Sequence, residues 1–357
     1  MQTLQIAVFD GDGIGPEITE PTVKLIDKVA REAQVAMVFN HLPAGAGHYR
    51  DHGESLPETS LQKARAADAI LLSAMGLPGV RYPDGTEIVP QVQLRIELDL
   101  YAGLRPVKLL PGQSSPLALP PGKTIDFVLV RESTEGLFAS MNKGEVTENE
   151  ARETMVITRG VTEKLSDFAF KLARKRKAKG HPGQVMCVDK ANVFRAFAFM
   201  RKVFEERAAL NPDLDATAGY VDAVALWMVQ KPWIFDVMIT ENMFGDILSD
   251  LGAGLMGGLG MAPSADIGDG HAVFQPCHGT APDIAGQGIA NPLAMVLSGA
   301  MMLDWLAEER QLPGLAEAGD RLRSAVTHVL AEGKAVTPDL GGAASTTGLA
   351  AAVEAAL

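Results

Sequence analysis

The segment ENMFGDILSDLGAGLMGGLG (residues 241–260) is the most informative part of this sequence, and the strand-like run 237–240 leads into it. Asp246 and Asp250 are four residues apart, so on a helix their carboxylates lie on one face. Two such carboxylates repel each other unless a cation lies between them, and oxygen ligands suit Mg²⁺ or Mn²⁺. An acidic helix face exposed to solvent is the alternative. Apolar neighbours predict a packed helix, which favours the metal site.

On both sides of this segment, short apolar runs alternate with longer amphipathic stretches. The predicted strands are 6–9, 69–72, 127–130, 184–188 and 237–240. The predicted helices are 17–33, 161–177, 194–209 and 294–309. This alternation indicates an α/β architecture. A chain of 357 residues with 47% hydrophobic content is long enough for two domains.

The charge balance limits the classes of partner. Lys and Arg number 32 and Asp and Glu 44, so the net charge is −12 and nothing global attracts nucleic acid or an anionic membrane. An acidic protein that binds an acidic substrate must gather its arginines locally. No apolar run reaches the roughly 20 residues of a membrane span, and no signal-like leader is present, so we expect a cytoplasmic protein. Cys187 and Cys277 are expected to be buried free thiols.

Two glycine-rich segments are candidates for cofactor contacts. The segment GDGIGPE (11–17) follows a strand-like run, but the third glycine of a GxGxxG fingerprint would fall at Pro16. It is therefore predicted to be a tight strand-to-helix turn whose backbone N–H groups could face a ligand. The second segment, 275–292, is a long loop of small residues around Asp283. A carboxylate there can accept hydrogen bonds from both hydroxyls of an unphosphorylated ribose, and it would repel a 2′-phosphate.

Several charged residues near predicted strand ends are candidates for chemistry. Lys190 follows the strand 184–188, where open α/β sheets place their ligands, and a desolvated lysine can transfer protons. Asp222 follows a predicted turn. Three guanidinium groups in one site would fit a dicarboxylate substrate, because each can bind a carboxylate through two hydrogen bonds. The candidates are Arg95, Arg105 and Arg131. Taken singly, such residues are more often surface charges.

Taken together, these segments resemble the family of decarboxylating 2-hydroxy acid dehydrogenases that act on isocitrate, 3-isopropylmalate, homoisocitrate, tartrate or D-malate. The matches follow the family's order and span nearly the whole chain. They are GDGIGPE (11–17), LR and DLYAGLRPVK (94–108), VRESTEG (130–136), DKANV (189–193), YVDA (220–223), ENMFGDILSDLGAGLMGGLG (241–260), PSADIGD (263–269), HGTAPDIAG (278–286), ANP (290–292) and TPDLGG (337–342). GDILSD together with HGTAPDIAG is the most specific combination.

The resemblance implies a two-domain α/β fold of the isocitrate/isopropylmalate dehydrogenase type, not a Rossmann fold. One domain, which binds the cofactor, would be built from both chain ends, residues 1–99 and 253–357. The other, residues 100–252, would carry the dimer contacts and the substrate and metal residues. The active site would lie in the cleft and be completed by a second subunit. The resemblance therefore implies a homodimer with shared active sites.

The resemblance also implies a role for each candidate residue. The substrate carboxylates would be bound by Arg95, Arg105 and Arg131. The ligands of Mg²⁺ or Mn²⁺ would be Asp246 and Asp250 with the partner subunit's Asp222. The partner subunit's Lys190 would transfer a proton, assisted by Asp222. The NAD contacts would be Ile14, His278, Gly279, Ala281, Asp283 and Asn291. The implied reaction is oxidation of the hydroxyl by NAD, loss of CO₂ and protonation of the enol.

Two single positions and the specificity segment before Arg95 depart from the family pattern. Phe138 stands where the family usually has a Tyr that helps to protonate the enol, and Phe has no proton to give. Gln275 stands where many NAD-using members carry Glu. Phe138 motivates an alternative of another class, a non-catalytic regulatory subunit that keeps the binding site. The intact lysine and carboxylates argue against it.

The substituent at C3 of the substrate is the open question. Val193 and Ile88 would favour an alkyl group, whereas Gln91 and Gln93 would favour a polar one. The leading interpretation is a 3-isopropylmalate-like or 3-alkylmalate dehydrogenase. A tartrate or D-malate enzyme and a homoisocitrate or isocitrate enzyme are the alternatives within the class.

Overall fold

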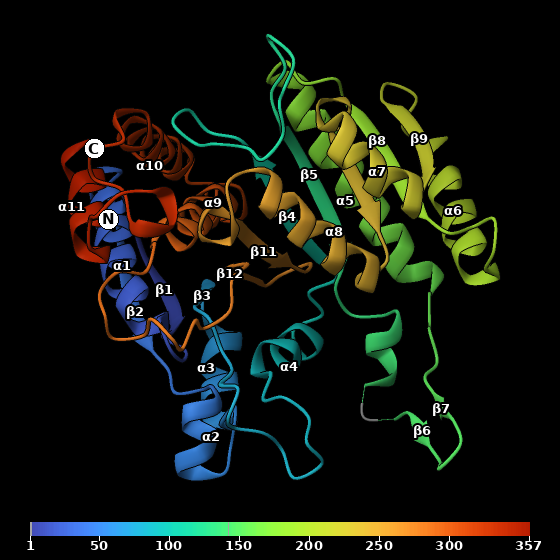
Figure 1. The fold of residues 1–357 in the computed structure, drawn as a ribbon, viewed down its shortest axis with the longest axis horizontal. Helices are drawn as coiled ribbons and strands as arrows, with labels where there is room; N and C mark the ends of the chain where they lie inside the picture. Colours follow the sequence, from blue (N-terminus) through green and yellow to red (C-terminus); the bar gives the residue numbers. More distant parts are fainter. Residues whose placement is uncertain (1, 142) are drawn as a thin grey trace.

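The structure is a computed structural model that describes residues 2–141 and 143–357. The strands in these residues are β1 (Gln2–Phe9), β2 (Val35–His41), β3 (Ala69–Leu72), β4 (Ala102–Lys108), β5 (Asp126–Glu132), β6 (Glu145–Val146), β7 (Ala151–Arg152), β8 (Gln184–Asp189), β9 (Asp215–Tyr220), β10 (Val237–Thr240), β11 (Pro263–Ile267) and β12 (Ala272–Pro276). Within the described residues, ten of them form one sheet in the order β2-β1-β3-β12-β11-β4-β5-β10-β8-β9, while β6 and β7 form a separate hairpin (Figure 1).

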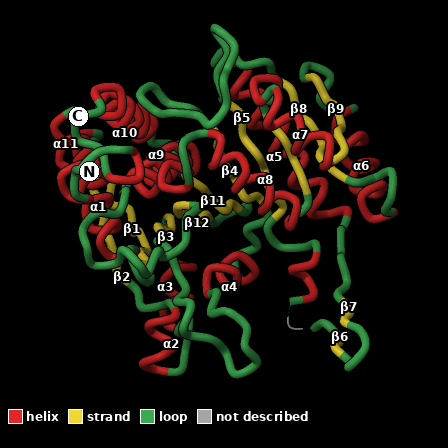
Figure 2. Tube along the Cα trace, viewed as in Figure 1, coloured by secondary structure: helices red, strands yellow, loops and turns green. Residues whose placement is uncertain are grey.

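Helices cover both faces of this sheet (Figure 2). They are α1 (Gly15–Glu32), α2 (Ala46–His52), α3 (Glu58–Ala66), α4 (Pro90–Glu97), α5 (Arg159–Ala178), α6 (Arg195–Ala208), α7 (Val221–Gln230), α8 (Asn242–Leu255), α9 (Leu293–Glu309), α10 (Pro313–Glu332) and α11 (Thr346–Ala355). Every predicted strand and helix is confirmed, and the predicted helices end within two residues of the observed ends. Among the described residues, no helix is long and apolar enough to cross a membrane.

The centre of the sheet excludes a Rossmann arrangement. Strand β11 runs antiparallel to both β12 and β4, and β4 runs antiparallel to β5, whereas the other pairings are parallel. Strands β1, β2, β3, β11 and β12 come from the two chain ends and form one half of the sheet. Strands β4, β5, β8, β9 and β10 come from the middle of the chain and form the other half. The division into domains at residues 99 and 253 stays a prediction.

Side chains alternate across the sheet and so build a core on each face. Met186 and Val188 of β8 pack in the core that contains α7 and α8, while Val185 and Cys187 pack in the core that contains α5 and α6. The other half repeats this division, because alternate residues of β1 and β3 face α1 on one side and α3 and α4 on the other. Cys187 is a buried free thiol as predicted, whereas Cys277 is free and only partly buried.

Candidate active site

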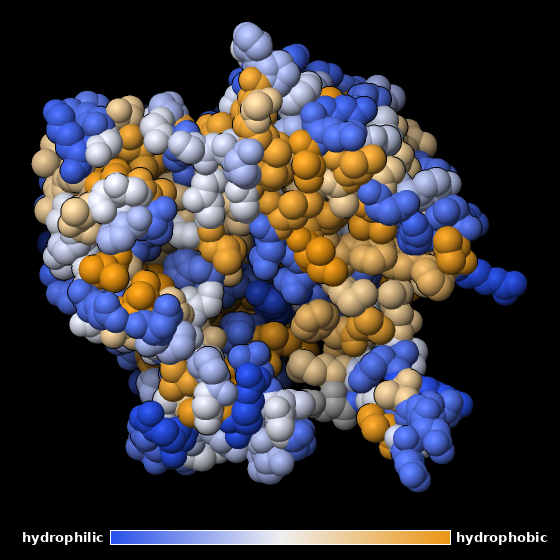
Figure 3. All heavy atoms as spheres, in the orientation of Figure 1, coloured by the Kyte–Doolittle hydropathy of each residue, from blue (hydrophilic) through white to orange (hydrophobic). Residues whose placement is uncertain are grey.

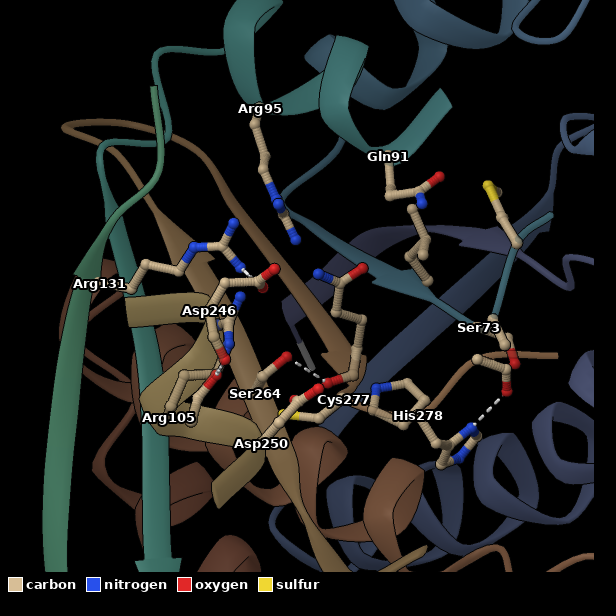
Figure 4. A pocket seen from close by; sticks show the side chains of 17 residues that line it. Ser73, Gln91, Arg95, Arg105, Arg131, Asp246, Asp250, Ser264, Cys277 and His278 are labelled. Carbon is tan, nitrogen blue, oxygen red and sulfur yellow. Dashed lines mark hydrogen bonds and ion pairs between the residues drawn. The ribbon is translucent and has the colours of Figure 1, made fainter. Parts of the chain in front are cut away.

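A cavity of about 180 Å³ opens where α4, α8 and the carboxyl ends of β3, β5 and β12 meet (Figure 4). Open α/β sheets bind their ligands at this kind of edge. The polar lining residues are Ser73, Gln91, Arg95, Arg105, Arg131, Asp246, Ser249, Asp250, Ser264, Gln275, Cys277 and His278. The structure thus brings together all three predicted arginines and both predicted carboxylates of α8, which lie up to 155 residues apart in the sequence (95 to 250).

The three arginines reach the cavity from three different elements. Arg95 points into it from α4, and Arg105 and Arg131 come from β4 and β5 (Figure 4). All three are at least 91% buried, since their exposed fractions are 9%, 5% and 4%. Burial, and then the nearby charge of Arg95, lower the pKa of Arg131 to about 10, so it stays charged at neutral pH. Three arginines are therefore concentrated in one place inside an acidic protein, as the sequence predicts.

Below these arginines lies a fully buried carboxylate, Asp266 of β11. It accepts hydrogen bonds from Arg95 Nε at 2.9 Å, Arg105 Nη2 at 3.1 Å and Gln275 Nε2 at 2.8 Å. Burial alone would raise the pKa of Asp266, but the charges of Arg105, Arg95 and Arg131 outweigh it and lower the pKa to about 2. Asp266 is therefore ionised, and it fixes two of the arginines from the side that faces away from the cavity.

The two carboxylates of α8 line the opposite wall, one turn apart. Glu241 begins the helix, because its side chain accepts a hydrogen bond from the backbone N–H of Phe244. Asp246 forms an ion pair with Arg131. Burial and the charge of Asp246 raise the pKa of Asp250. Two like charges held this close are a suitable donor set for a hard divalent cation.

One chain by itself supplies only part of such a metal site. Within residues 2–141 and 143–357, no three His, Cys, Asp or Glu side chains come together as a metal-binding group. Lys190 and Asp222, the remaining predicted catalytic residues, form an ion pair with each other, but neither lines the cavity. The hydrogen bond from Lys190 lowers the pKa of Asp222, so its carboxylate is ionised. The cavity of one chain thus contains Asp246 and Asp250 without Lys190 and Asp222.

The segments predicted to contact the cofactor lie side by side at the edge of the cavity. The backbone N–H of Ile14 donates to the carbonyl of Thr280 at 2.9 Å, which joins the turn 11–17 to the loop 278–286. His278 Nε2 is buried and, within the described residues, has no hydrogen-bond partner. Burial lowers the pKa of His278, which keeps the ring neutral at neutral pH. Asp283 is exposed on the same loop.

Part of the predicted strand-to-helix turn is closed by hydrogen bonds within the protein. The backbone N–H groups of Asp12, Ile14 and Gly15 donate to the carbonyls of Ala74, Thr280 and Asp12 respectively, so these three are not available to a ligand. The turn is closed by the neighbouring strand end and loop, which the sequence alone could not reveal. The Asn291 side chain also has a partner within the protein, because its Nδ2 atom donates a hydrogen bond to Asp339 Oδ2 at 2.9 Å.

Comparison with known proteins agrees with this geometry. The family model "Isocitrate/isopropylmalate dehydrogenase" matches residues 5–354. The chain belongs to the isocitrate/isopropylmalate dehydrogenase family. It is 41% identical over 343 residues to a 3-isopropylmalate/3-methylmalate dehydrogenase of Methanocaldococcus jannaschii, covering 96% of this chain and 95% of that one. It is 39% identical over 354 residues to a 3-isopropylmalate dehydrogenase of Methanothermobacter thermautotrophicus, covering 99% and 98%.

Solved structures confirm the fold of the isocitrate/isopropylmalate dehydrogenase family. An isocitrate dehydrogenase from Methylococcus capsulatus superimposes with a TM-score of 0.85 at 34% identity, covering 100% of this chain and 99% of that one. A protein of Thermus thermophilus superimposes with a TM-score of 0.87 at 36% identity, covering 99% and 68%. The protein is therefore a dehydrogenase, an oxidoreductase that acts on a CH–OH group.

The structure also separates the residues that could set specificity in this isocitrate/isopropylmalate dehydrogenase family member. Gln91 lines the cavity, whereas Gln93 is exposed and Ile88 is fully buried away from it. Val193 is exposed and lies outside the cavity lining. Phe138 packs its ring against Arg131, 5.5 Å from the guanidinium carbon. Phe138, which stands where the family usually has Tyr, thus lies beside Arg131.

Sequence reasoning missed Asp266 and the space that it needs. Gly103 of β4 lies opposite Asp266, and a Cβ atom there would be 3.0 Å from Asp266 Oδ1 and 2.5 Å from Ser133 Oγ. The signal was present as an acid inside the apolar stretch 263–267, but nothing in the sequence identified its partners.

We expect Gly103→Ala to disturb the arginines through Asp266. The added methyl group should lower the free energy of unfolding by about 1–3 kcal/mol and raise the KM for the dicarboxylate substrate. Thermal unfolding and steady-state kinetics would measure both effects. Gly160→Ala is the matched control, because a Cβ atom there meets nothing within 4 Å. Unchanged stability and an unchanged KM in Gly103→Ala would show that a methyl group at position 103 does not crowd Asp266.

Proposed function

We propose that the protein catalyses the NAD-dependent, Mg²⁺- or Mn²⁺-dependent oxidative decarboxylation of a 3-substituted malate, with 3-isopropylmalate as the leading substrate. The observation that carries this proposal is the convergence of three buried arginines and two helix carboxylates on one cavity. Relatives that bear the name 3-isopropylmalate dehydrogenase support the choice of substrate.

The charge of the cavity supports a dicarboxylate. Three guanidinium groups face the three carboxylates of Asp246, Asp250 and Asp266, so their formal charges cancel. A divalent cation adds two positive charges, which match the two negative charges of a malate-type dicarboxylate. Every substrate of the leading interpretation and of its alternatives contains this 2-hydroxy dicarboxylate core.

In the proposed reaction, this chain's residues bind, orient and move protons. Arg95 keeps both terminal Nη groups for a carboxylate, because Asp266 takes only its Nε–H. When bound, the divalent cation would supply Lewis-acid activation of the substrate hydroxyl, and NAD would accept the hydride. The partner subunit's Lys190 would accept the hydroxyl proton at Nζ, and the partner subunit's Asp222 would hold that amine in place.

This chain has an exposed apolar surface to which a second subunit could bind. Figure 3 shows hydrophobic side chains gathered over α7 and α8, beside a hydrophilic hollow. Their exposed members include Leu226 at 53%, Val229 at 45% and Ile247 at 62%. Large exposed apolar patches mark interaction sites. We therefore propose a homodimer with shared active sites, in which this face meets its counterpart next to the cavity.

One observation favours a second candidate substrate. The Oε1 atom of Gln91 is buried in the cavity wall and, among the described residues, has no hydrogen-bond partner. A substrate with a hydroxyl at C3, such as tartrate, would satisfy it, whereas an isopropyl group would leave it unpaired. Homoisocitrate and isocitrate carry a polar C3 substituent as well.

A substrate panel tests the proposed function. Purified protein with Mn²⁺ and NAD would receive 3-isopropylmalate, D-malate, tartrate, isocitrate or homoisocitrate, and NADH and CO₂ would be followed together. Equal amounts of NADH and CO₂ with 3-isopropylmalate are expected. A higher kcat/KM with tartrate would establish the second candidate instead. No NADH with any substrate would contradict the proposal and favour a regulatory subunit. A cytoplasmic location and the lack of nucleic-acid partners stay predictions from the sequence.

We expect a preference for NAD that depends on Asp283. Its carboxylate would accept hydrogen bonds from the ribose hydroxyls of NAD and would repel the 2′-phosphate of NADP. Asp283→Asn should reduce the ratio of kcat/KM for NAD over NADP at least about tenfold, because the repulsion is lost while the shape is kept. Glu317→Gln, an exposed substitution on α10, is the matched control. Equal efficiency with both cofactors in the wild type would exclude this role.

A further inference from the structure

Asp266 and Gln275 are diagonal neighbours on the antiparallel strands β11 and β12, and their side chains share one hydrogen bond. Gln275 Nε2 donates to Asp266 Oδ2 at 2.8 Å, and the same oxygen accepts from Arg95 Nε at 2.9 Å. Asp266 is 0% exposed and Gln275 is 7% exposed. Because Asp266 is closed to water, its protonation state is set by its neighbours, while the Gln275 amide carries no charge.

The hydrogen bonds define which partner carries the charge. Asp266 accepts from two guanidinium groups, from the Ser133 hydroxyl at 3.3 Å and from the Gln275 amide. A carboxylate with four donors around it is satisfied as an anion. A second carboxylate at position 275 would lie at hydrogen-bond distance from this anion, in a buried site.

We propose that Asp266 is a positioning residue for the substrate-binding edge of Arg95, and that Gln275 must stay neutral for Asp266 to do this. Asp266 binds the Nε side of Arg95, so both Nη groups remain directed into the cavity (Figure 4). Gln275 completes the shell around the shared oxygen without adding charge. The pair thereby keeps a single negative charge below the arginines.

The surroundings of the pair contain both signs of charge. The charged and titratable groups that face it are Arg95 on α4, Arg105 on β4, Arg131 on β5, Asp246 and Asp250 on α8, and Cys277 after β12. In Gln275→Glu, two carboxylates would compete for these arginines. One of them would hold a proton at acidic pH, because like charges at this distance cannot both ionise without cost. The folded-state pKa of that carboxyl would be raised above its unfolded value.

The test exchanges the two side chains. Gln275→Glu and Asp266→Asn alone should each lower kcat/KM for the dicarboxylate at least about tenfold. The double variant Asp266→Asn/Gln275→Glu keeps one carboxylate and one amide with their places exchanged, and should recover to within about threefold of the wild type. Gln93→Glu, the same change at an exposed position of α4, is the matched control. If the losses of kcat/KM in the two single variants simply multiplied in the double variant, the proposal would be overturned.

Thermal unfolding against pH gives a readout that needs no activity. A raised folded-state pKa stabilises below the unfolded pKa and loses that contribution as pH rises through the folded pKa. The Tm of Gln275→Glu should therefore fall, relative to wild type, by at least about 3 °C between about pH 5 and about pH 9. The Tm of the double variant and of Gln93→Glu should follow the wild-type Tm over the same pH range. A parallel profile for Gln275→Glu and wild type would overturn the pairing.

The kinetic part of this inference rests on the proposed function, and the unfolding part does not. If the wild type turned over no substrate of the panel, the proposed function would fail, while the four Tm profiles would still decide whether Asp266 and Gln275 form a charge-matched pair. If Gln275→Glu did not fold, recovery of folding in the double variant would support the pair, and failure of the double variant would contradict it.

Discussion

Mixing subunits that carry Lys190→Met with subunits that carry Asp246→Asn is expected to restore about a quarter of the wild-type activity, although each variant alone is inactive. In a shared site, the cavity of one chain uses the lysine of the other. Half of the randomly assembled dimers combine both variants, and one of their two sites then contains an intact Asp246 and an intact Lys190. Steady-state NADH production after unfolding and refolding the mixture would measure the recovery.

The structural reason is the separation of the two groups within one chain. Lys190 pairs with Asp222 outside the cavity, while Asp246 lines it. Removing the lysine that accepts the hydroxyl proton should lower kcat by about 10²–10⁴-fold. Lys190→Met mixed with Asp222→Asn is the control, because both groups enter the site from the same subunit and no mixed dimer contains a complete site. Recovery in the control, or none in the test mixture, would contradict a shared active site.

The second large effect concerns the carboxylates of α8. Asp250→Asn is expected to weaken Mn²⁺ binding at least about a hundredfold and to abolish metal-dependent NADH production. The reason is that Asp246 and Asp250, which line the cavity, would be two of the three ligands at each metal site. Mn²⁺ affinity measured by electron paramagnetic resonance separates binding from catalysis. Glu317→Gln removes an exposed carboxylate and should leave the affinity unchanged.

The same substitution has a consequence without metal. Burial and the charge of Asp246 raise the pKa of Asp250, so the ionised pair is unfavourable in the empty protein. Asp250→Asn should therefore raise the Tm of the metal-free protein while reducing the Tm gain on adding Mn²⁺. Full metal-dependent activity in Asp250→Asn or in Asp246→Asn would show that the metal assignment is wrong.

The elements of the fold could largely be predicted from the sequence. The strand-and-helix alternation placed α1, α5, α6 and α9 to within two residues. The apolar faces of α1, α5 and α6 repeat with the period of a helix, whereas α9 is apolar along most of its length. The spacing of Asp246 and Asp250 placed both carboxylates on one face of α8, where the structure has them. The family resemblance, through GDILSD and HGTAPDIAG, led to the correct fold class and excluded the Rossmann interpretation of the first glycine turn.

Contacts that depend on sheet order could not be predicted in this way. The amides of Asp12 and Ile14 in the first turn donate to Ala74 and Thr280, which approach them because β3 lies beside β1 and β12 lies beside β3. Gln91 and Gln93 look equivalent in the sequence, but they point to different sides of α4, and only Gln91 reaches the cavity.

The amino-acid sequence alone was therefore enough to predict the local elements, the class of enzyme and the charged groups available for chemistry. Which of those groups meet depends on the tertiary structure. Asp266 is 171 residues from Arg95 along the chain, and it lies beneath that arginine because β11 is inserted between β12 and β4. Helix periodicity is set by neighbours a few residues apart, whereas such a contact is set by strand order, which no short stretch of sequence encodes.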